Sequence, residues 1–327
     1  MLVHGQYGLI TLMSEPLISI IIPAFNEQGA IAETVGQITR VDLPAFEILV
    51  VDDGSSDNTA ANAEAAGARV VRHPYNIGNG AAVKTGIRNA RGQVCVFLDG
   101  DGQHDPNDIP RLLAHIPRYH MVVGARSRGS ETHWHRDLAN FVYNKFASFI
   151  AEFQIEDLTS GFRAMRREDA RRFCDMFPNG FSYPTTSTLA FIRSGRSVRY
   201  IPIKTRYRLG KSKIRLIHDG LEFFLIIIKI AMSFSPLRVF IPVASFLFFL
   251  GLGRYIYTYF LFGQFTNMSH LLMNSSVIVF MLGLIAEQIA SLRLEKGDKL
   301  FGVEDETLFH VLSEKYNELE SEPRTDR

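Results

Sequence analysis

The sequence predicts an α/β domain with a mainly parallel sheet, followed by a pair of membrane-spanning helices. Three observations lead to this prediction. Short apolar runs alternate with helical stretches from residue 18 onward, three of these runs end in acidic residues, and two long apolar segments stand near the C-terminal end. Alternating strands and helices are typical of α/β domains, which bind ligands at the carboxyl ends of their strands.

Each strand is predicted from a short apolar run that ends in a turn. The runs are ISIIIP, EILVV, ARVVRH, QVCVFLD and MVVGAR, which begin at residues 18, 47, 68, 93 and 121. The helices between them are predicted near Ala30–Thr39, Asp57–Ala66, Gly80–Arg91 and Pro106–His115. Strands joined through helices are expected to pair in parallel, because a parallel pair needs a long crossover connection.

Two apolar segments are long enough to cross a bilayer. Val239–Phe262 contains one charged residue, Arg254, and Leu271–Leu292 contains one, Glu287. A span needs about 20 residues, and the alternative of a buried soluble hairpin is disfavoured because soluble helices seldom stay apolar on every face. The link Gly263–His270 lacks Lys and Arg, whereas both flanks are basic. The positive-inside rule therefore places the α/β domain and both termini in the cytoplasm.

The expected organisation has five parts. They are an N-terminal tail (1–17), the α/β domain (18–210), interfacial amphipathic helices (211–236), two transmembrane helices (237–292) and a cytoplasmic tail (293–327). Apolar residues recur at helical spacing over Lys213–Met232, which suits the membrane interface; an ordinary core-facing helix is the alternative. No signal peptide is predicted, and Met13 is a second candidate for the start.

Composition narrows the function further. The chain has 327 residues, with 35 Lys and Arg against 34 Asp and Glu. This balance excludes nucleic acid as a partner, because nucleic-acid-binding proteins carry a large basic excess. The only cysteines, Cys95 and Cys174, favour a reducing compartment. A mean hydropathy of +0.04 is typical of a soluble part fused to a small membrane part.

Acidic residues stand directly after three of the predicted strands. Glu27 follows the first, the run Asp52–Asp57 follows the second, and Asp99 and Asp101 follow the fourth. A single end of this kind is more often a turn than a site. Three at one edge of a parallel sheet gather the negative charge that holds a hard divalent cation, and such a cation usually accompanies a diphosphate.

Four motifs in order carry a resemblance to a known family. ISIIIPAFNE, ILVVDDGSSDNT, NIGNGAAVKTGIRNARG and VFLDGDGQHDP resemble the family 2 glycosyltransferases with the GT-A fold. The two predicted spans, with DLTSGFRAM and RYRLGKSKI, make the chain similar to the polyprenyl-phosphate branch, which includes dolichol-phosphate mannose synthase. The resemblance implies transfer of a hexose from a nucleotide sugar to a dolichyl or undecaprenyl phosphate. The product would be a lipid-linked sugar for glycan or cell-envelope assembly.

The resemblance also implies which residues hold the donor. The nucleoside pocket and the turn beneath the nucleotide are expected to use Pro23, Phe25, Glu27, Asp52, Asp53, Asn76, Gly78, Gly80, Ala82 and Asp99. Asp99, Asp101 and Gln103 are implied ligands of Mg²⁺ or Mn²⁺.

Cations are expected to face the acceptor, because the diphosphate leaving group and the incoming lipid phosphate repel each other. The acceptor-phosphate candidates are Arg136, Arg206, Lys211 and Lys213, and the predicted catalytic set is Asp101, Arg126, Arg136, Asp157 and Arg163. A phosphate monoester is already anionic at neutral pH, so no general base is needed and in-line attack inverts the anomeric carbon. Asp157 is interpreted as orienting an arginine.

Two alternatives are considered, one a different enzyme of the same superfamily and the other from another class of function. A processive membrane polysaccharide synthase would carry a Gln-x-x-Arg-Trp motif, which is absent because the only tryptophan, Trp134, follows Thr132 and His133. An inactive membrane-anchored assembly subunit would not need the acidic residues at the strand ends. The residues do not distinguish GDP-mannose from a UDP-hexose such as UDP-glucose, and they leave open whether the chain forms a homo-oligomer.

Overall fold

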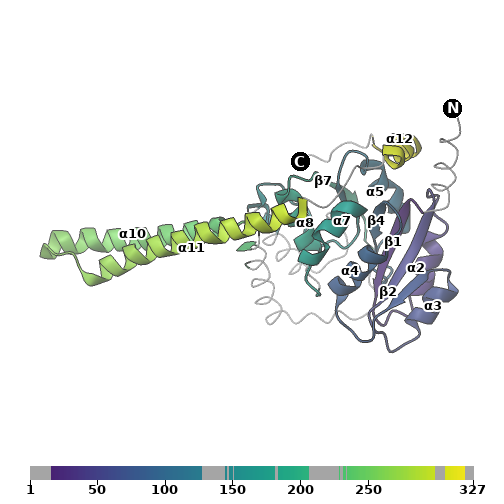
Figure 1. Ribbon diagram of the computed structural model, residues 1–327, viewed down its shortest axis with the longest axis horizontal. Helices are drawn as coiled ribbons and strands as arrows, with labels where there is room; N and C mark the ends of the chain where they lie inside the picture. Colours follow the sequence, from purple (N-terminus) through teal and green to yellow (C-terminus); the bar gives the residue numbers. More distant parts are fainter. Residues whose placement is uncertain are drawn as a thin grey trace. The chain divides into compact units, whose positions relative to one another are not determined.

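The structure is a computed structural model that describes residues 16–126, 144–145, 147–149, 151–180, 183–205, 228, 231–232, 234–298 and 306–320. The chain forms two compact units, which are drawn in Figure 1. The first unit comprises residues 1–144, 155–213 and 301–327, and the second comprises 145–154 and 214–300. Most of the helix predicted at Lys213–Met232 lies outside the described residues.

A seven-stranded sheet forms the centre of the first unit. Its strands are β1 Ile18–Ala24, β2 Phe46–Asp52, β3 Arg69–Arg72, β4 Val94–Phe97, β5 Met121–Arg126, β6 Arg163–Arg166 and β7 Val198–Ile203. Their order in space is β3-β2-β1-β4-β6-β5-β7, and only β6 runs antiparallel to its neighbours. The predicted fold class is confirmed, and all five predicted strands form; β6 and β7 were not predicted.

Helices cover both faces of this sheet. They are α2 Ile31–Ile38, α3 Thr59–Ala65, α4 Asn79–Asn89, α5 Ile109–His115, α7 Arg167–Phe173, α8 Tyr183–Arg193 and α12 Glu306–Glu320, with short 3-10 turns η1 Pro106–Asp108 and η2 Cys174–Met176. Strand β1 is buried along its whole length, as expected for a central strand with helices on both sides. Ile20 joins the core cluster with α2 and α5, whereas Ile21 points to the other face, against Gly86 of α4.

The C-terminal helix α12 belongs to the core of the first unit. Leu312 is fully buried and Tyr316 nearly so, both in the same apolar cluster as α5. Lys315 forms an ion pair of 2.8 Å with Asp42, whose backbone oxygen also accepts a hydrogen bond from the Tyr316 hydroxyl. The segment predicted as a polar tail therefore contains a helix that packs against the sheet unit.

Two long antiparallel helices dominate the second unit. Helix α10 covers Pro236–Phe262 and α11 covers Asn267–Asp298, so both predicted spans lie within helices. Both are long and apolar enough to cross a membrane by length and composition. At a rise of 1.5 Å per residue α10 is about 40 Å long, against about 30 Å for a hydrocarbon core. In the most apolar stretch of each helix, only 11% of the residues are buried in α10 and 17% in α11, whereas a core helix of a soluble protein is mostly buried.

Polar contacts at the start of α10 organise this hairpin. The Glu287 carboxylate of α11 accepts a hydrogen bond from the backbone N–H of Leu237 at 3.1 Å. A carboxylate at this position stabilises the positive end of the helix dipole. Arg238 forms an ion pair with Glu152 and donates to the backbone oxygen of Phe149, which ties the segment 145–154 to the hairpin.

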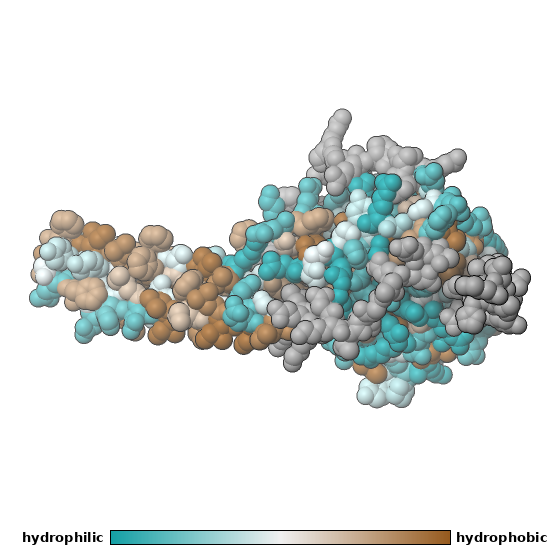
Figure 2. All heavy atoms as spheres, turned by 45° about the horizontal axis from the view of Figure 1, so that its top comes forward, coloured by the Kyte–Doolittle hydropathy of each residue, from teal (hydrophilic) through white to brown (hydrophobic). Residues whose placement is uncertain are grey.

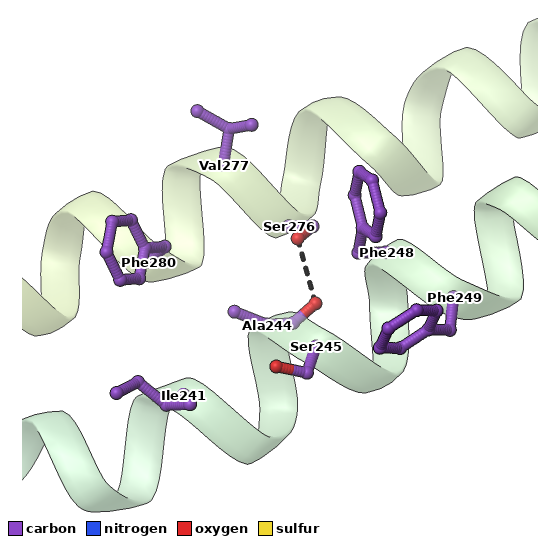
Figure 3. A pocket seen from close by; sticks show the side chains of 8 residues that line it. All are labelled: Ile241, Ala244, Ser245, Phe248, Phe249, Ser276, Val277 and Phe280. Atoms are coloured by element: carbon purple, nitrogen blue, oxygen red, sulfur yellow. Dashed lines mark hydrogen bonds between the residues drawn. The ribbon is translucent and has the colours of Figure 1, made fainter.

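The surface of the hairpin is apolar. Figure 2 shows hydrophobic side chains along the two long helices, whereas the surface of the sheet unit is mostly hydrophilic. A groove of about 360 Å³ lies between α10 and α11. Figure 3 shows the side chains that line it. In it Ser276 donates a hydrogen bond of 2.8 Å to the backbone oxygen of Ala244. The groove is lined by Ile241, Ala244, Ser245, Phe248, Phe249, Ser276, Val277 and Phe280, so it is a feature of the hairpin alone.

Candidate active site

The two loops that follow β1 and β2 at their carboxyl ends are joined by hydrogen bonds. Asn26, whose φ of 56° is left-handed, donates its backbone N–H to the Ser55 hydroxyl and accepts the backbone N–H of Ser56. The Thr59 hydroxyl accepts the backbone N–H of Glu27 in the same way. These bonds fix the backbone directly after Phe25, which is 41% exposed. The loops at the carboxyl ends of β1, β2, β3 and β4 form the rim of the sheet. At Phe25 this rim presents an aromatic face on a rigid turn.

Asp52 at the end of β2 is fully buried. Its Oδ1 accepts the backbone N–H of Ser55 at 3.0 Å, and its Oδ2 lies 3.0 Å from the Nε of Arg72. The carboxylate has no exposed surface, so the structure shows it bound within the chain, and its contact with the nucleoside stays a prediction. The group exposed at this point of the rim is the Arg72 side chain, which is 57% exposed.

The neighbouring Asp53 is used to hold the chain that follows β3. Its Oδ1 lies 2.7 Å from the Nδ1 of His73 and accepts the backbone N–H of Ile77, while its Oδ2 accepts that of Gly78. The other ring nitrogen of His73 contacts the Thr85 hydroxyl at 2.9 Å. Asp53 was predicted to touch the nucleotide, but its oxygens are engaged with the loop from 73 to 78.

The glycines at the start of α4 make room for another part of the chain. A Cβ on Gly80 would lie 2.0 Å from the backbone oxygen of Pro178, and one on Gly78 would lie 2.4 Å from that of Asn179. The backbone N–H of Gly80 donates to the oxygen of Gly180, and Lys84 donates to the side chain of Asn179. The close approach of residues 178–180 is one reason for the small size of these glycines, and their predicted place beneath the nucleotide stays a prediction.

Asp99, Asp101 and Gln103 follow β4 and remain half-buried. Asp101 accepts the backbone N–H of Gln103 at 3.1 Å, which closes a tight turn. The Asp99 side chain is 36% exposed and lies against Gly161, where an added Cβ would be 2.8 Å from its Oδ2. Within the described ranges no group of three or more His, Cys, Asp or Glu residues could hold a metal by itself.

These three side chains nevertheless fit a hard divalent cation. They supply two carboxylates and one amide oxygen at an open rim. Magnesium is usually held by one or two carboxylates and completed by substrate phosphates and water. The donor set therefore matches an ion that arrives with a diphosphate.

Asp157 and Arg126 form a two-point ion pair at the end of β5. The Nε and Nη2 of Arg126 donate to the two oxygens of Asp157 at 2.7 and 2.9 Å. Asp157 also accepts the backbone N–H groups of Thr159 and Ser160. Burial alone would raise the pKa of Asp157, but the hydrogen bonds and positive charge of Arg126 outweigh it and hold the pKa below its usual value. The geometry has Asp157 orienting an arginine.

Arg163 lies inside the protein. Its guanidinium has no exposed surface and donates to the backbone oxygens of Ser160 and Pro184 and to the hydroxyls of Ser187 and Thr188. Burial lowers the pKa of Arg163. In the structure this guanidinium links the loop before β6 to α8, and its predicted role toward the acceptor stays a prediction.

Of the remaining predicted residues, three are described by the structure and four are not. Glu27 and Asn76 lie at or near the surface of the rim, whereas Pro23 is buried within β1. Four predicted cations lie outside the described residues, namely Arg136, Arg206, Lys211 and Lys213.

Two residues of the site were missed by the sequence analysis. Arg72 becomes visible only once β2 and β3 are paired, because the register sets it opposite Asp52. His104 is 7% exposed, stacks on Phe162 with ring centroids 5.1 Å apart, and places its Nε2 3.5 Å from Asp99. Its position directly after Gln103 was the available signal.

Comparison with known proteins places this geometry in a family. Residues 19–173 match the family described as glycosyl transferase family 2, and residues 235–292 match the family described as the GtrB C-terminal hairpin. Polyprenol monophosphomannose synthase of Mycolicibacterium smegmatis is 32% identical over 212 residues, 60% of this chain and 80% of that protein.

A second relative has a different sugar in its name. Undecaprenyl-phosphate 4-deoxy-4-formamido-L-arabinose transferase of Sodalis glossinidius is 34% identical over 178 residues, which cover 51% of this chain and 54% of that protein. The chain thus spans about half the length of this relative.

A solved structure shares the fold. Glucosyl-3-phosphoglycerate synthase from Mycobacterium tuberculosis, crystallised with Mn²⁺, UDP and glucosyl-3-phosphoglycerate, has a TM-score of 0.55 and 21% identity. The likeness covers 67% of this chain and 80% of that one. At this identity it shows the sheet architecture alone.

Proposed function

This chain belongs to glycosyl transferase family 2, and on that premise we propose that it transfers a hexose from a nucleotide sugar to the phosphate of a polyprenyl phosphate. The resemblance drawn from the four sequence motifs is thereby confirmed, and the chain is a glycosyltransferase. The observation that carries the proposal is the presence in one chain of an acidic sheet rim and a hairpin that matches the GtrB C-terminal hairpin.

The donor is proposed to lie across the carboxyl ends of β1, β2 and β4. Phe25 offers an aromatic face for the nucleoside, while Asp99, Asp101 and Gln103 would hold Mg²⁺ or Mn²⁺ with the diphosphate. When bound, the ion would neutralise charge on the leaving diphosphate. GDP-mannose and UDP-hexoses such as UDP-glucose both suit these residues.

The acceptor phosphate is proposed to meet Arg126. Its guanidinium is held at two points by Asp157 and is 25% exposed, so it offers a fixed cation at the end of β5. A fixed cation offsets the repulsion between two phosphates without reorganising during the reaction. The acceptor oxygen is already an anion at neutral pH, so it needs no base and attacks the anomeric carbon with inversion.

Both termini are proposed to lie on the cytoplasmic side of the membrane. Helix α12 follows the hairpin and belongs to the same compact unit as the sheet that precedes it. A chain that leaves one unit and returns to it crosses a bilayer an even number of times, which agrees with two spans. The basic flanks of the hairpin favour the cytoplasm for this unit.

The experiment uses the full chain in detergent with polyprenyl phosphate and radiolabelled nucleotide sugars. The expected result is label in the organic phase with one of the GDP- or UDP-sugars, dependent on Mg²⁺ or Mn²⁺. Asp101→Ala is expected to lower transfer about 100-fold or more, as for loss of a charge-stabilising group.

The matched control is Asp105→Asn in the same segment. The Asp105 carboxylate accepts the backbone N–H of Asn107 at the start of η1, and asparagine serves equally well as such a cap. This variant is expected to keep its activity. Absence of label in the organic phase with every donor would overturn the function, and transfer that survives chelation would overturn the metal assignment.

A further inference from the structure

We infer that Arg72 reads the nucleobase of the donor and selects bases that present a carbonyl oxygen over bases that present an amino group. This inference rests on the proposed use of a nucleotide donor and adds a residue that the sequence motifs did not indicate.

The Arg72 guanidinium is fixed at two points. Its Nε lies 3.0 Å from the Oδ2 of Asp52, and its Nη2 donates to the backbone oxygen of Ser55 at 2.7 Å. The parallel register of β2 and β3 sets Asp52 directly beside Arg72, so the pair is built into the sheet. The side chain is 57% exposed, and the ion pair with Asp52 and the hydrogen bond to Ser55 favour this orientation.

The remaining amino group of Arg72 is available to a ligand. None of the hydrogen bonds found within the described residues uses its Nη1, and Asp52 beneath it has no exposed surface. At this point the rim presents hydrogen-bond donors and no acceptor from Asp52. Two exposed rings flank the same loops, Phe25 at 41% and Tyr75 at 67% exposure. The backbone of Tyr75 packs directly on Gly54 of the turn after β2.

The position of Arg72 in the sheet favours a base over a phosphate. The proposed metal ligands follow β4, and Arg72 ends β3, three strands away in the order β3-β2-β1-β4. Neighbouring strands are about 4.8 Å apart, so the two strand ends are separated by about 14 Å. A diphosphate held at β4 therefore leaves the far end of the nucleotide, its base, for the β2–β3 end of the rim.

The donor character of Arg72 determines which bases fit. Guanine offers O6 and N7 as acceptors, and uracil, like thymine, offers O4. Adenine and cytosine carry amino groups at the corresponding positions, so a hydrogen-bond donor of the base would face the donors of the Arg72 guanidinium. Arg72 is the last residue of β3, and Asp53 holds the backbone that follows it through His73 and Ile77, so the guanidinium cannot turn away at low cost.

The test measures binding of GDP, UDP, ADP, CDP and inorganic pyrophosphate, each with Mg²⁺, to the full chain in detergent. We expect the tighter of GDP and UDP to bind at least about 10-fold more strongly than ADP and CDP, as for one lost hydrogen bond to a charged group. Arg72→Met should reduce this discrimination to near unity and weaken the preferred nucleotide by about 10- to 100-fold. The affinity for pyrophosphate should stay unchanged.

Three further variants separate recognition from folding. Arg69→Met removes an arginine from the opposite end of β3, where it pairs with Glu47, and should leave base discrimination intact. Asp52→Asn combined with Arg72→Met avoids a buried unpaired carboxylate, and it should bind like Arg72→Met alone. Arg72→Lys should restore the discrimination only in part, since an ammonium lacks the planar fork.

The possible outcomes distinguish the role of Arg72 from the proposed function. Base discrimination that survives Arg72→Met overturns the inference, and so does an equal loss of pyrophosphate affinity, which would mean that Arg72 binds phosphate. If the wild type binds none of the nucleotides, the proposed function fails and not only the role of Arg72.

Discussion

Replacing Asp157 with asparagine should destabilise the protein and lower its transferase activity. The Asp157 carboxylate, 8% exposed, accepts two guanidinium hydrogen bonds and one backbone hydrogen bond from Arg126, with further bonds from Thr159 and Ser160. Asparagine would set its amide N–H₂ against the guanidinium. Breaking a buried pair costs about 3–5 kcal/mol. Because Arg126 is 25% exposed, its contact with water offsets part of this cost. We expect the free energy of unfolding to fall by about 2–4 kcal/mol.

The pH dependence gives this prediction a second readout. The pKa of Asp157 is lower in the folded protein than its ordinary value, so the folded state favours the ionised form. The stabilisation is therefore complete above the unfolded pKa, about 3.9, and is lost as the pH falls through the folded pKa. The difference in stability between wild type and Asp157→Asn should be full at neutral pH and shrink below about pH 4.

The assay is thermal unfolding of the full chain in detergent at neutral and acidic pH, with transfer measured in parallel. The matched control is Asp175→Asn, which breaks an arginine–aspartate pair with Arg88 on the surface, where Asp175 is 87% exposed. Exposed pairs contribute about 0–1 kcal/mol, so this variant should unfold almost like wild type. Equal effects of the two substitutions, or a loss at Asp157 that does not depend on pH, would refute the reasoning.

Two further predictions concern packing. Gly80→Ala should destabilise the protein by about 1–3 kcal/mol, as for overpacking, because its Cβ would meet the backbone oxygen of Pro178 at 2.0 Å. Gly29→Ala, with nothing within 4 Å, is the control in the same thermal assay, and equal melting temperatures would contradict the contact. Leu312→Asp should release α12 by placing a charge in the core, seen as rapid proteolysis of the C-terminal segment. Unchanged proteolysis would show that Leu312 does not hold the helix.

The sequence was sufficient for the strands that alternate with helices, because each of them is a short apolar run followed by a turn. It was insufficient for β6, whose four residues RAMR contain two arginines. Such a polar stretch becomes a strand because Arg163 and Arg166 find partners for their guanidinium groups on α8 and at the end of α5. A partner set of this kind is tertiary and leaves no local pattern.

Helix α12 was missed for a different reason. Its apolar residues Phe309, Leu312, Tyr316 and Leu319 recur at helical spacing, which is a readable signal. The acidic and basic residues between them made the segment resemble a solvated tail. The periodicity was the better guide, since a helix needs only one apolar face to pack on a domain.

The acidic residues at the strand ends differ in role, and the difference follows from how far each side chain is buried. Asp52 and Asp53 have no or almost no exposed surface and hold Arg72 and the loop after β3, whereas Asp99 is partly exposed toward the rim. A buried carboxylate must be paired or hydrogen-bonded, so its partners in the chain determine what it can do. The motif Asp-Asp at β2 therefore contributes to the proposed site through the arginine and the loop it fixes, and direct contact with a ligand is left to the residues whose polar atoms remain exposed.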